Sequence, residues 1–233
     1  MSHHKIPVVA GLATAVVAAL VLVGGESAVA ESGADTVEYT SMSPEALAEY
    51  LIFDARGFDL DQEIQEGGTV RQRLVQDELQ KTCSALHGAR AEGDTASRVI
   101  VMAREAIIYP EGGIKLGDWK KGEALARSGF GFRVGHKTDD HSGREPGGNC
   151  YACHQLDPDE IAYGTLGPSL TAYGKTRGTG EAMLKYTYEV IYSPHSYFPC
   201  TKMPRFGANG FLTQEQIADI MAYVMHPESP VNQ

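Results

Sequence analysis

The feature that most constrains this chain is the pentapeptide Cys150-Tyr151-Ala152-Cys153-His154. Two cysteines separated by two residues and followed directly by a histidine form the attachment pattern of a c-type haem. Each thiol can add to one haem vinyl group and form a thioether, and the adjacent histidine then lies under the iron as its proximal ligand. One short helical turn can present all three side chains. The motif therefore predicts one covalently attached haem c, held by Cys150, Cys153 and His154.

Two other kinds of site use a pair of cysteines at this spacing. A zinc site needs a second pair of ligands, and none follows the motif at a suitable distance. A redox-active cysteine pair usually lies in a βαβ context, whereas the residues around this motif are rich in glycine and proline. We therefore favour the haem site over the zinc site and the redox pair.

Residues 1–30 have the features of a secretory signal peptide. A short start, His3-His4-Lys5, precedes an apolar stretch from Ile6 to Val23 that is rich in alanine and valine. The tripeptide Ala28-Val29-Ala30 matches an A-x-A cleavage site. We expect cleavage after Ala30 and an exported, periplasmic protein. An uncleaved membrane anchor is the alternative, because the apolar stretch is long.

Length and charge narrow the class of protein further. The 233 residues suffice for one or two domains. The net charge is −10, and removal of the signal peptide does not change it, because that segment holds one lysine and one glutamate. This balance argues against a nucleic-acid partner, which needs a basic face. It is compatible with a soluble periplasmic protein that docks through local charged patches.

The first part of the mature chain, 31–115, is predicted to be a helical extension without a catalytic motif. Helices are expected over residues 43–57, 69–86 and 94–109. Ser43-Pro44 is typical of a helix start, and apolar residues of the second helix recur at i, i+3/i+4. Cys83 belongs to this apolar stripe and is expected to face inward. The favoured interpretation is an extension that packs on the haem domain or on a partner.

The haem domain is predicted over 116–233 and is again helical. Helices are expected over residues 118–127 and 180–192, and from Thr213 to the stop at Pro227. Thr213 and Gln216 form a capping box at the start of the last helix. The first and last of these helices are expected to pair, with Tyr223 crossing near Gly122. Together with the extension, these elements predict an all-α fold.

Two histidines lie in the polar, glycine-rich connection 129–149, which is longer than a usual connection between helices. His136 and His141 are each more typical of solvated loop histidines than of iron ligands. The sequence around them offers no ligand pattern, so we assign neither histidine to the haem.

The segment Gly164-Thr165-Leu166-Gly167-Pro168-Ser169-Leu170 follows the haem motif and is expected to support its histidine. A metal-ligating histidine needs a partner for its second ring nitrogen, which fixes the ring orientation and raises its basicity. The backbone carbonyl of Pro168 is the natural candidate partner of His154. The alternative is a Gly-Pro turn with no role at the haem.

A methionine that precedes a proline, Met203-Pro204, lies in a loop between the haem motif and the last helix. A thioether sulfur opposite histidine raises the haem potential, and Met203 is the predicted distal iron ligand. Methionines on helices more often pack in the core. The competing candidates are Cys200, His195 and three methionines on predicted helices, Met183, Met221 and Met225.

Two cysteines remain once the haem thiols are assigned. An exported protein meets an oxidising compartment, so we predict a disulfide between Cys83 and Cys200. The bond would join the N-terminal extension to the loop that carries Met203. The alternatives are two unpaired buried thiols and, for Cys200, a role as a haem ligand.

The chain resembles the SoxX family, the monohaem cytochrome c subunits of the SoxAX complex of bacterial sulfur oxidation. The resemblance is strongest over 116–232. It rests on five stretches: Gly148 to Gln155, Gly164 to Leu170, Met203 to Gly207, Leu212 to Val224, and Pro227 to Val231. The run from Met203 to the Pro-Glu-Ser-Pro tail is more specific than the haem motif, which all c-type cytochromes share.

The resemblance implies a class I cytochrome c-like haem domain with an N-terminal helical extension, and a role inside a larger enzyme. SoxAX oxidatively joins thiosulfate to a cysteine of the carrier SoxYZ, acting as an L-cysteine S-thiosulfotransferase. The sulfur chemistry belongs to the SoxA subunit, at a haem whose modified cysteine ligand has no counterpart here. The SoxX-like subunit of the heterodimer has a His/Met haem and passes electrons to an external acceptor cytochrome. No catalytic residue carries over to this chain.

Two other interpretations of function stay open. A free-standing periplasmic electron carrier would need the same haem but no enzyme partner, and no helices such as those expected over 43–110. An interaction or assembly protein with a structural haem is disfavoured by a methionine ligand. The extension therefore weakly favours the subunit interpretation.

Overall fold

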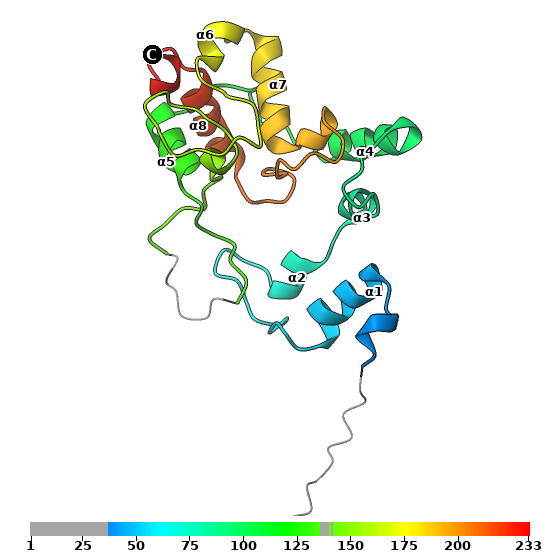
Figure 1. The fold of residues 1–233 in the computed structure, drawn as a ribbon. Coiled ribbons are helices and arrows are strands. Elements are labelled where there is room, and N and C mark those ends of the chain that lie inside the picture. The colour runs from blue at the N-terminus through cyan, green and yellow to red at the C-terminus, as the bar shows by residue number, and fades with distance from the viewer. Residues whose placement is uncertain (1–36, 136–139, 141) are drawn as a thin grey trace, which may run out of the picture. The chain divides into compact units, whose positions relative to one another are not determined.

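The computed structural model describes residues 37–135, 140 and 142–233 (Figure 1). The predicted signal peptide, its cleavage site after Ala30, and both His136 and His141 lie outside the described residues. The chain divides into two compact units between Met42 and Ser43. The described part of the first unit holds a 3-10 turn over Tyr39–Ser41. The domain boundary predicted between residues 115 and 116 lies within the second unit and stays a prediction.

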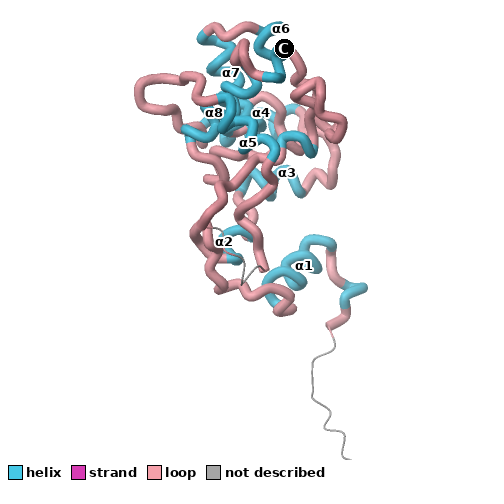
Figure 2. The backbone as a smooth tube through the Cα atoms, turned by 90° about the vertical axis from the view of Figure 1, so that its left-hand side faces the viewer, coloured by secondary structure: helices cyan, strands magenta, loops and turns pink. Residues whose placement is uncertain are grey.

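The second unit is helical, as the sequence predicts. Its α-helices are α1 (Pro44–Glu49), α2 (Val70–Leu74), α3 (Glu78–Ser84), α4 (Gly93–Glu105), α5 (Trp119–Arg127), α6 (Tyr173–Arg177), α7 (Glu181–Tyr192) and α8 (Gln214–Met225). Within the described ranges the chain forms no strand, only an isolated antiparallel bridge between Glu63 and Thr69 (Figure 2). None of the described helices combines the length and apolarity that a bilayer crossing requires.

Helices α5 and α8 cross in direct backbone contact at Gly122. A Cβ atom on Gly122 would lie 1.9 Å from the carbonyl oxygen of Asp219 and 3.0 Å from the nitrogen of Ile220. Only glycine permits this approach. The Asp219 carboxylate accepts from the backbone N–H of Asp118 at 2.7 Å, which ties the start of α5 to the middle of α8. The closest backbone approach on α8 is at Asp219 and Ile220, one turn before the predicted Tyr223.

The main core gathers around this crossing. Its buried residues include Leu125, Leu156, Tyr188, Tyr192, Phe206, Ile217, Ile220, Met221, Tyr223 and Met225. The predicted capping box is formed, because the Thr213 hydroxyl accepts from Gln216 N–H and the Gln216 side chain accepts from Thr213 N–H. Leu212 and Ile217, which flank the cap, are buried. The local signals at the start of α8 therefore agree with its place in the core.

The helix predicted over 69–86 is broken into α2 and α3. Val75 adopts an extended conformation, and Asp77 caps a new helix by accepting from Gln80 N–H at 2.8 Å. An aspartate side chain that bonds its own backbone competes with helix continuation. The apolar periodicity runs through the break, which is why it predicts a single helix. Asp77, at this break, also forms an ion pair with Arg205 of the predicted haem domain.

Other helix bounds differ from expectation for local reasons. The helix predicted over 43–57 is α1 followed by a π-helical turn, Tyr50–Asp54, and the left-handed residue that follows is Arg56 rather than Gly57. The short helix α6 is not among the helices expected from the sequence. Its Gly174 lies against the backbone of Met225, where a Cβ would be 2.1 Å from the carbonyl oxygen. Tertiary packing of this kind leaves no periodic signal in five residues.

The α5–α8 contact gives the first prediction. In the variant Gly122→Ala the added methyl group must push the two helices apart, because it would collide with the backbone of α8 at Asp219 and Ile220. Overpacking of this kind typically costs about 1–3 kcal/mol. We expect the urea midpoint of unfolding, followed by far-UV circular dichroism, to fall accordingly. Gly143→Ala is the control, since its Cβ would meet nothing within 4 Å. Equal midpoints for the two variants would contradict the packing argument.

Candidate haem site

The haem motif lies on a tight turn immediately after a left-handed residue. Asn149 has φ 47°, and Cys150–Ala152 form a 3-10 turn. The N–H groups of Cys153 and His154 both donate to the carbonyl of Cys150, at 3.1 and 2.9 Å. The predicted helical turn is therefore present, and it brings the two cysteines and the histidine together. Both thiols are free, and burial raises the pKa of the Cys150 thiol to about 12.

The segment that leads into the motif is hydrogen-bonded to the end of α5. Gly148 N–H donates to Leu125 O at 2.9 Å, and Asn149 N–H donates to Ser128 O at 2.8 Å. A Cβ on Gly148 would lie 3.3 Å from the Cys150 sulfur. Backbone groups rather than side chains therefore fix where the first cysteine lies.

The ring of His154 is oriented by the segment that follows the motif. Its Nδ1 lies 2.7 Å from the carbonyl oxygen of Pro168. A carbonyl oxygen only accepts, so Nδ1 carries the proton and Nε2 keeps the lone pair. A Cβ on Gly167 would lie 2.2–2.8 Å from three atoms of the ring, so glycine is required there. Gly167 N–H donates to Cys153 O at 2.8 Å, which fastens the segment to the motif.

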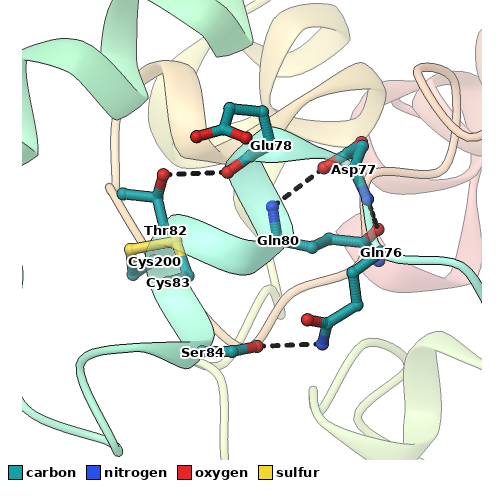
Figure 3. Close-up of a disulfide and its surroundings, with 8 residues drawn as sticks. All are labelled: Gln76, Asp77, Glu78, Gln80, Thr82, Cys83, Ser84 and Cys200. Carbon is teal, nitrogen blue, oxygen red and sulfur yellow. Dashed lines mark hydrogen bonds between the residues drawn. A yellow bond between two sulfur atoms is a disulfide. The ribbon is translucent and has the colours of Figure 1, made fainter. Parts of the chain in front are cut away.

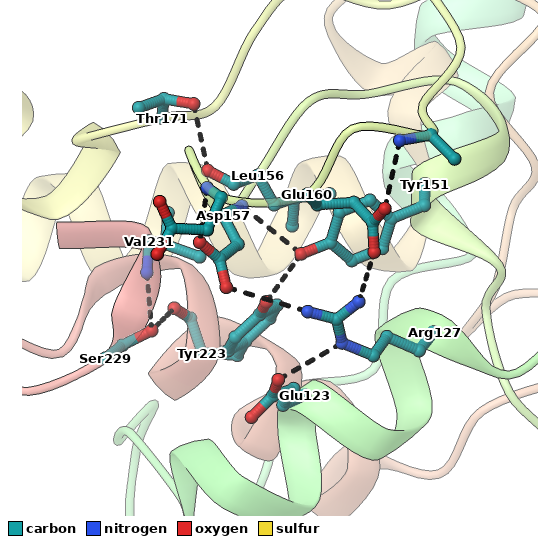
Figure 4. A network of polar contacts seen from close by, with 12 residues as sticks. Glu123, Arg127, Tyr151, Leu156, Asp157, Glu160, Thr171, Tyr223, Ser229 and Val231 are labelled. Atoms are coloured by element: carbon teal, nitrogen blue, oxygen red, sulfur yellow. Dashed lines mark hydrogen bonds and ion pairs between the residues drawn. The ribbon is translucent and has the colours of Figure 1, made fainter. Parts of the chain in front are cut away.

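A buried tyrosine pair, which no pattern in the sequence indicates, holds the motif onto α8 (Figure 4). The hydroxyls of Tyr151 and Tyr223 are 2.7 Å apart. The Tyr151 hydroxyl also accepts from Asp157 N–H at 3.2 Å. Burial, followed by the bond to Tyr151, raises the pKa of Tyr223, so the Tyr223 hydroxyl stays protonated. Tyr151, the first of the two residues between the cysteines, thus anchors the motif.

Arg127, at the end of α5, completes this network (Figure 4). Its guanidinium group is 2.6 Å from Glu160, 3.6 Å from Asp157 and 3.1 Å from Glu123. The same group lies 4.8 Å from the centre of the Tyr151 ring, within range of a cation–π contact. A hydrogen bond from Ala162 N–H and the bond from Arg127 lower the pKa of Glu160. The segment after the haem motif is thereby held to α5.

These residues fit a covalently bound haem c. Two free thiols and a histidine lie on one turn, and the histidine ring is fixed with Nε2 as its accepting nitrogen. Gly167 and Gly148 leave room where a side chain would collide with the ring or approach the first sulfur. In the described ranges, no three His, Cys, Asp or Glu side chains gather as a metal-ion site.

The Met203 loop, defined here as residues 200–205, is cross-linked to α3 at both ends. Cys200 is disulfide-bonded to Cys83, with Cα atoms 5.3 Å apart (Figure 3). Arg205 pairs with Asp77 through Nη2 and Oδ2 at 2.6 Å. The disulfide lies in a small core cluster with Leu79, Val99 and Ala103. The pairing predicted from the leftover cysteines is therefore present, and it links positions 117 apart in sequence.

Met203 itself is half-buried and packs against the main core. Ligation of iron by Met203 stays a prediction. Its rivals are placed as follows. Cys200 is engaged in the disulfide and offers no thiolate while that bond stands. Met221 and Met225 are fully buried in the core, and Met183 lies half-buried against it.

His195, the remaining rival, is buried in the 3-10 turn Pro194–Ser196 and is 8% exposed. Burial, and then the positive charge of Arg205, lower its pKa to about 4. No group among the described residues forms a hydrogen bond with its Nδ1. The imidazole is thus neutral at pH 7 and lies close enough to Arg205 and Asp77 to feel their charges.

Comparison with known proteins agrees with this site. The family profile for cytochrome c matches residues 146–227. An uncharacterized lipoprotein of Aquifex aeolicus (strain VF5) is 46% identical over 164 residues, which make up 68% of this chain and 73% of that protein. The matched profile begins just before the haem motif and ends after α8. It therefore covers the motif, the Pro168 segment and the Met203 loop.

The buried state of His195 predicts acid sensitivity. In the unfolded chain His195 becomes protonated below its ordinary pKa of 6.5. In the native protein it stays neutral down to about pH 4. The free energy of unfolding should therefore fall as pH falls through this window, by roughly 2–3 kcal/mol from this group. Urea titrations at pH 7, 5.5 and 4.5 measure the slope. The variant His195→Gln should lose that share of it, and an unchanged slope in the variant would contradict the assignment.

Proposed function

The chain belongs to the cytochrome c family and has its all-α class I fold, and on this premise we propose that it is the electron-transfer subunit of a SoxAX-type complex. Its haem would be one haem c with His154 and Met203 as axial ligands. The observation that carries the electron-transfer role is the His154 ring, held by Pro168 with Nε2 available. The resemblance to SoxX over 116–232 supports the more specific role.

The proposed role divides the chemistry between chains. Joining thiosulfate to a cysteine thiol forms one sulfur–sulfur bond and releases two electrons and one proton. We assign that bond formation to a SoxA-like partner acting on a SoxYZ-like carrier. This chain would accept the electrons and pass them to an external cytochrome. It is therefore proposed as a non-catalytic subunit of an L-cysteine S-thiosulfotransferase.

Each residue of the site has a part in this role. When bound, haem c supplies a one-electron redox centre. Cys150 and Cys153 hold it covalently, and the Pro168 carbonyl orients the His154 ring and raises its basicity. The thioether of Met203 would favour the reduced state, because Met/His ligation raises the potential. The Tyr151–Tyr223 bond and Arg127 keep the attachment turn rigid.

We further propose export to the periplasm with cleavage after Ala30. The relative from Aquifex aeolicus carries the name lipoprotein, which suggests an exported protein. Lipid attachment through a cysteine does not transfer to a particular residue here. The four cysteines of this sequence are Cys83, Cys150, Cys153 and Cys200, and all have other roles.

A free-standing electron carrier is the second candidate, and one observation favours it. The extension is cross-linked to the Met203 loop by the disulfide and by the Asp77–Arg205 pair. The extension therefore has a structural role within this chain, and a partner protein is not needed to explain its presence. Reconstitution with a partner protein distinguishes the two candidates.

Ligation is tested by Met203→Ala. The oxidised wild-type protein should show the far-red sulfur-to-iron charge-transfer band, and the variant should lose it completely. Its midpoint potential should also fall, because the thioether is gone. Met183→Ala is the matched control, since Met183 is another half-buried methionine that packs on the same core. A wild type without the band, or a variant that keeps it, would sink the assignment.

The subunit role is tested by reconstitution. Purified protein mixed with thiosulfate, the SoxYZ-like carrier and an oxidised cytochrome should show no turnover, because the described residues include no catalytic constellation beside the haem site. Addition of a SoxA-like subunit should start the reduction of the cytochrome. The partner assayed without this chain is the control. Turnover by this chain alone, or no stimulation of the partner, would count against the subunit role.

A further inference from the structure

We propose that Asp77 and Arg205 are positioning residues for the Met203 thioether, because their ion pair and the disulfide fix the Met203 loop at both ends on helix α3. This inference rests on the proposed ligation by Met203. It assigns to the N-terminal extension a role on the distal side of the haem. It also gives a function to the unexpected helix break at Asp77.

The Met203 loop has little internal structure of its own. Thr201 N–H donates to Phe198 O at 3.1 Å, and Met203 N–H reaches the Thr201 hydroxyl at 3.4 Å. Beyond the loop the chain is fixed again, because Gly207 and Ala208 both donate to Tyr192 O. Because the Met203 loop has so few hydrogen bonds of its own, its conformation depends on the contacts that hold its two ends.

Helix α3 supplies both holding points. Asp77 caps its start and Cys83 lies in its last turn, six residues later. Six residues of α-helix span about 9 Å. The helix therefore acts as a rigid spacer that sets the separation of residues 200 and 205. Its own position is fixed by Leu79, which packs with Val99 and Ala103 of α4.

Asp77 divides its two carboxylate oxygens between two tasks. Oδ1 accepts from Gln80 N–H at 2.8 Å and caps α3, while Oδ2 accepts from Arg205 at 2.6 Å. Burial opposes its ionisation, but the bonds from Gln80 and Arg205 outweigh it and lower the pKa of Asp77. The carboxylate is thus charged at neutral pH and can serve both partners at once.

Arg205 is the buried half of this pair. Its side chain is 8% exposed, whereas that of Asp77 is 50% exposed. A buried guanidinium that loses its carboxylate is costly, so the loop would have to move to bring Arg205 to water. Its backbone neighbour Phe206 lies in the main core, and the Phe206 ring would be 3.6 Å from a Cβ on Gly148. Movement of Arg205 is therefore coupled to Met203, two residues earlier, and through Phe206 to Gly148 beside the attachment turn.

The experiment compares Asp77→Asn with Gln80→Ala in the holoprotein. Asparagine caps a helix as well as aspartate does, so the first variant removes the charge partner of Arg205 and spares the cap. The second variant weakens the cap and spares the ion pair, because it removes the side chain that accepts from Asp77 N–H at 3.0 Å. The readouts are the far-red band, the affinity for imidazole as a competing iron ligand, and hydrogen exchange in residues 200–206.

In Asp77→Asn we expect a weaker far-red band and faster exchange in residues 200–206, with α5 and α8 unchanged. Imidazole should bind about tenfold more tightly, the change expected when one charge-assisted hydrogen bond is lost. Arg205→Gln should match it, and Arg205→Lys should recover part of the wild-type behaviour. Gln80→Ala should leave the band and imidazole affinity unchanged.

The outcomes separate this inference from the ligation on which it rests. If the wild type lacks the far-red band, Met203 is not the ligand and both fail. If the wild type has the band and Asp77→Asn keeps it with unchanged imidazole affinity, ligation stands and the positioning role is overturned. If Gln80→Ala has the same effect as Asp77→Asn, the helix cap rather than the ion pair is responsible, and the proposal is again overturned.

Discussion

The backbone contact between α5 and α8 is the constraint on which the haem site depends. Because Gly122 lets the helices touch, the end of α5 and the last turn of α8 both reach the attachment turn. From α5 come the carbonyls that receive Gly148 and Asn149, and the guanidinium of Arg127. From α8 comes the hydroxyl of Tyr223. One close approach thus places several separate supports of the same turn.

The two proposed iron ligands are supported by different parts of the chain. The His154 side is held within the haem domain, by Pro168 and by the network around Tyr151. The Met203 loop is held by α3, which lies in the predicted extension, through one covalent and one ionic cross-link. The two kinds of link differ in chemistry. Salt and pH act on the ion pair, whereas only reduction opens the disulfide.

Much of this could be predicted from residues that act locally. The haem motif, the capping box at Thr213 and the Gly-Pro segment are short patterns whose chemistry needs those residues in that order, and the structure places them together. The pairing of Cys83 with Cys200 followed from elimination among four cysteines. The break before α3 did not follow, because an apolar stripe has the same period on both sides of it. Asp77 and Gln80 do spell a capping box, and that signal could have located the break.

Contacts between distant residues were the part that sequence could not supply. Tyr151 occupies a variable position of the motif, and nothing in its neighbours indicates a partner 72 residues away. Two of the partners of Arg127, Asp157 and Glu160, lie 30 and 33 residues further along the chain. Such bonds depend on which helix faces meet. A single sequence encodes those faces as apolar stripes but does not say how they are matched.

The disulfide also has a consequence for how the protein must be made. On the proposed route of export, four thiols meet an oxidising compartment, where one pair has to be oxidised and the other has to stay reduced until haem attachment. The bond joins positions 117 apart, and the haem cysteines lie inside the ring that it closes. Disulfide exchange proceeds through the thiolate, and burial raises the pKa of Cys150 to about 12 in the folded chain. In the folded chain a thiol with so high a pKa exchanges slowly with a disulfide, so the burial of one sulfur atom opposes mispairing of that haem cysteine.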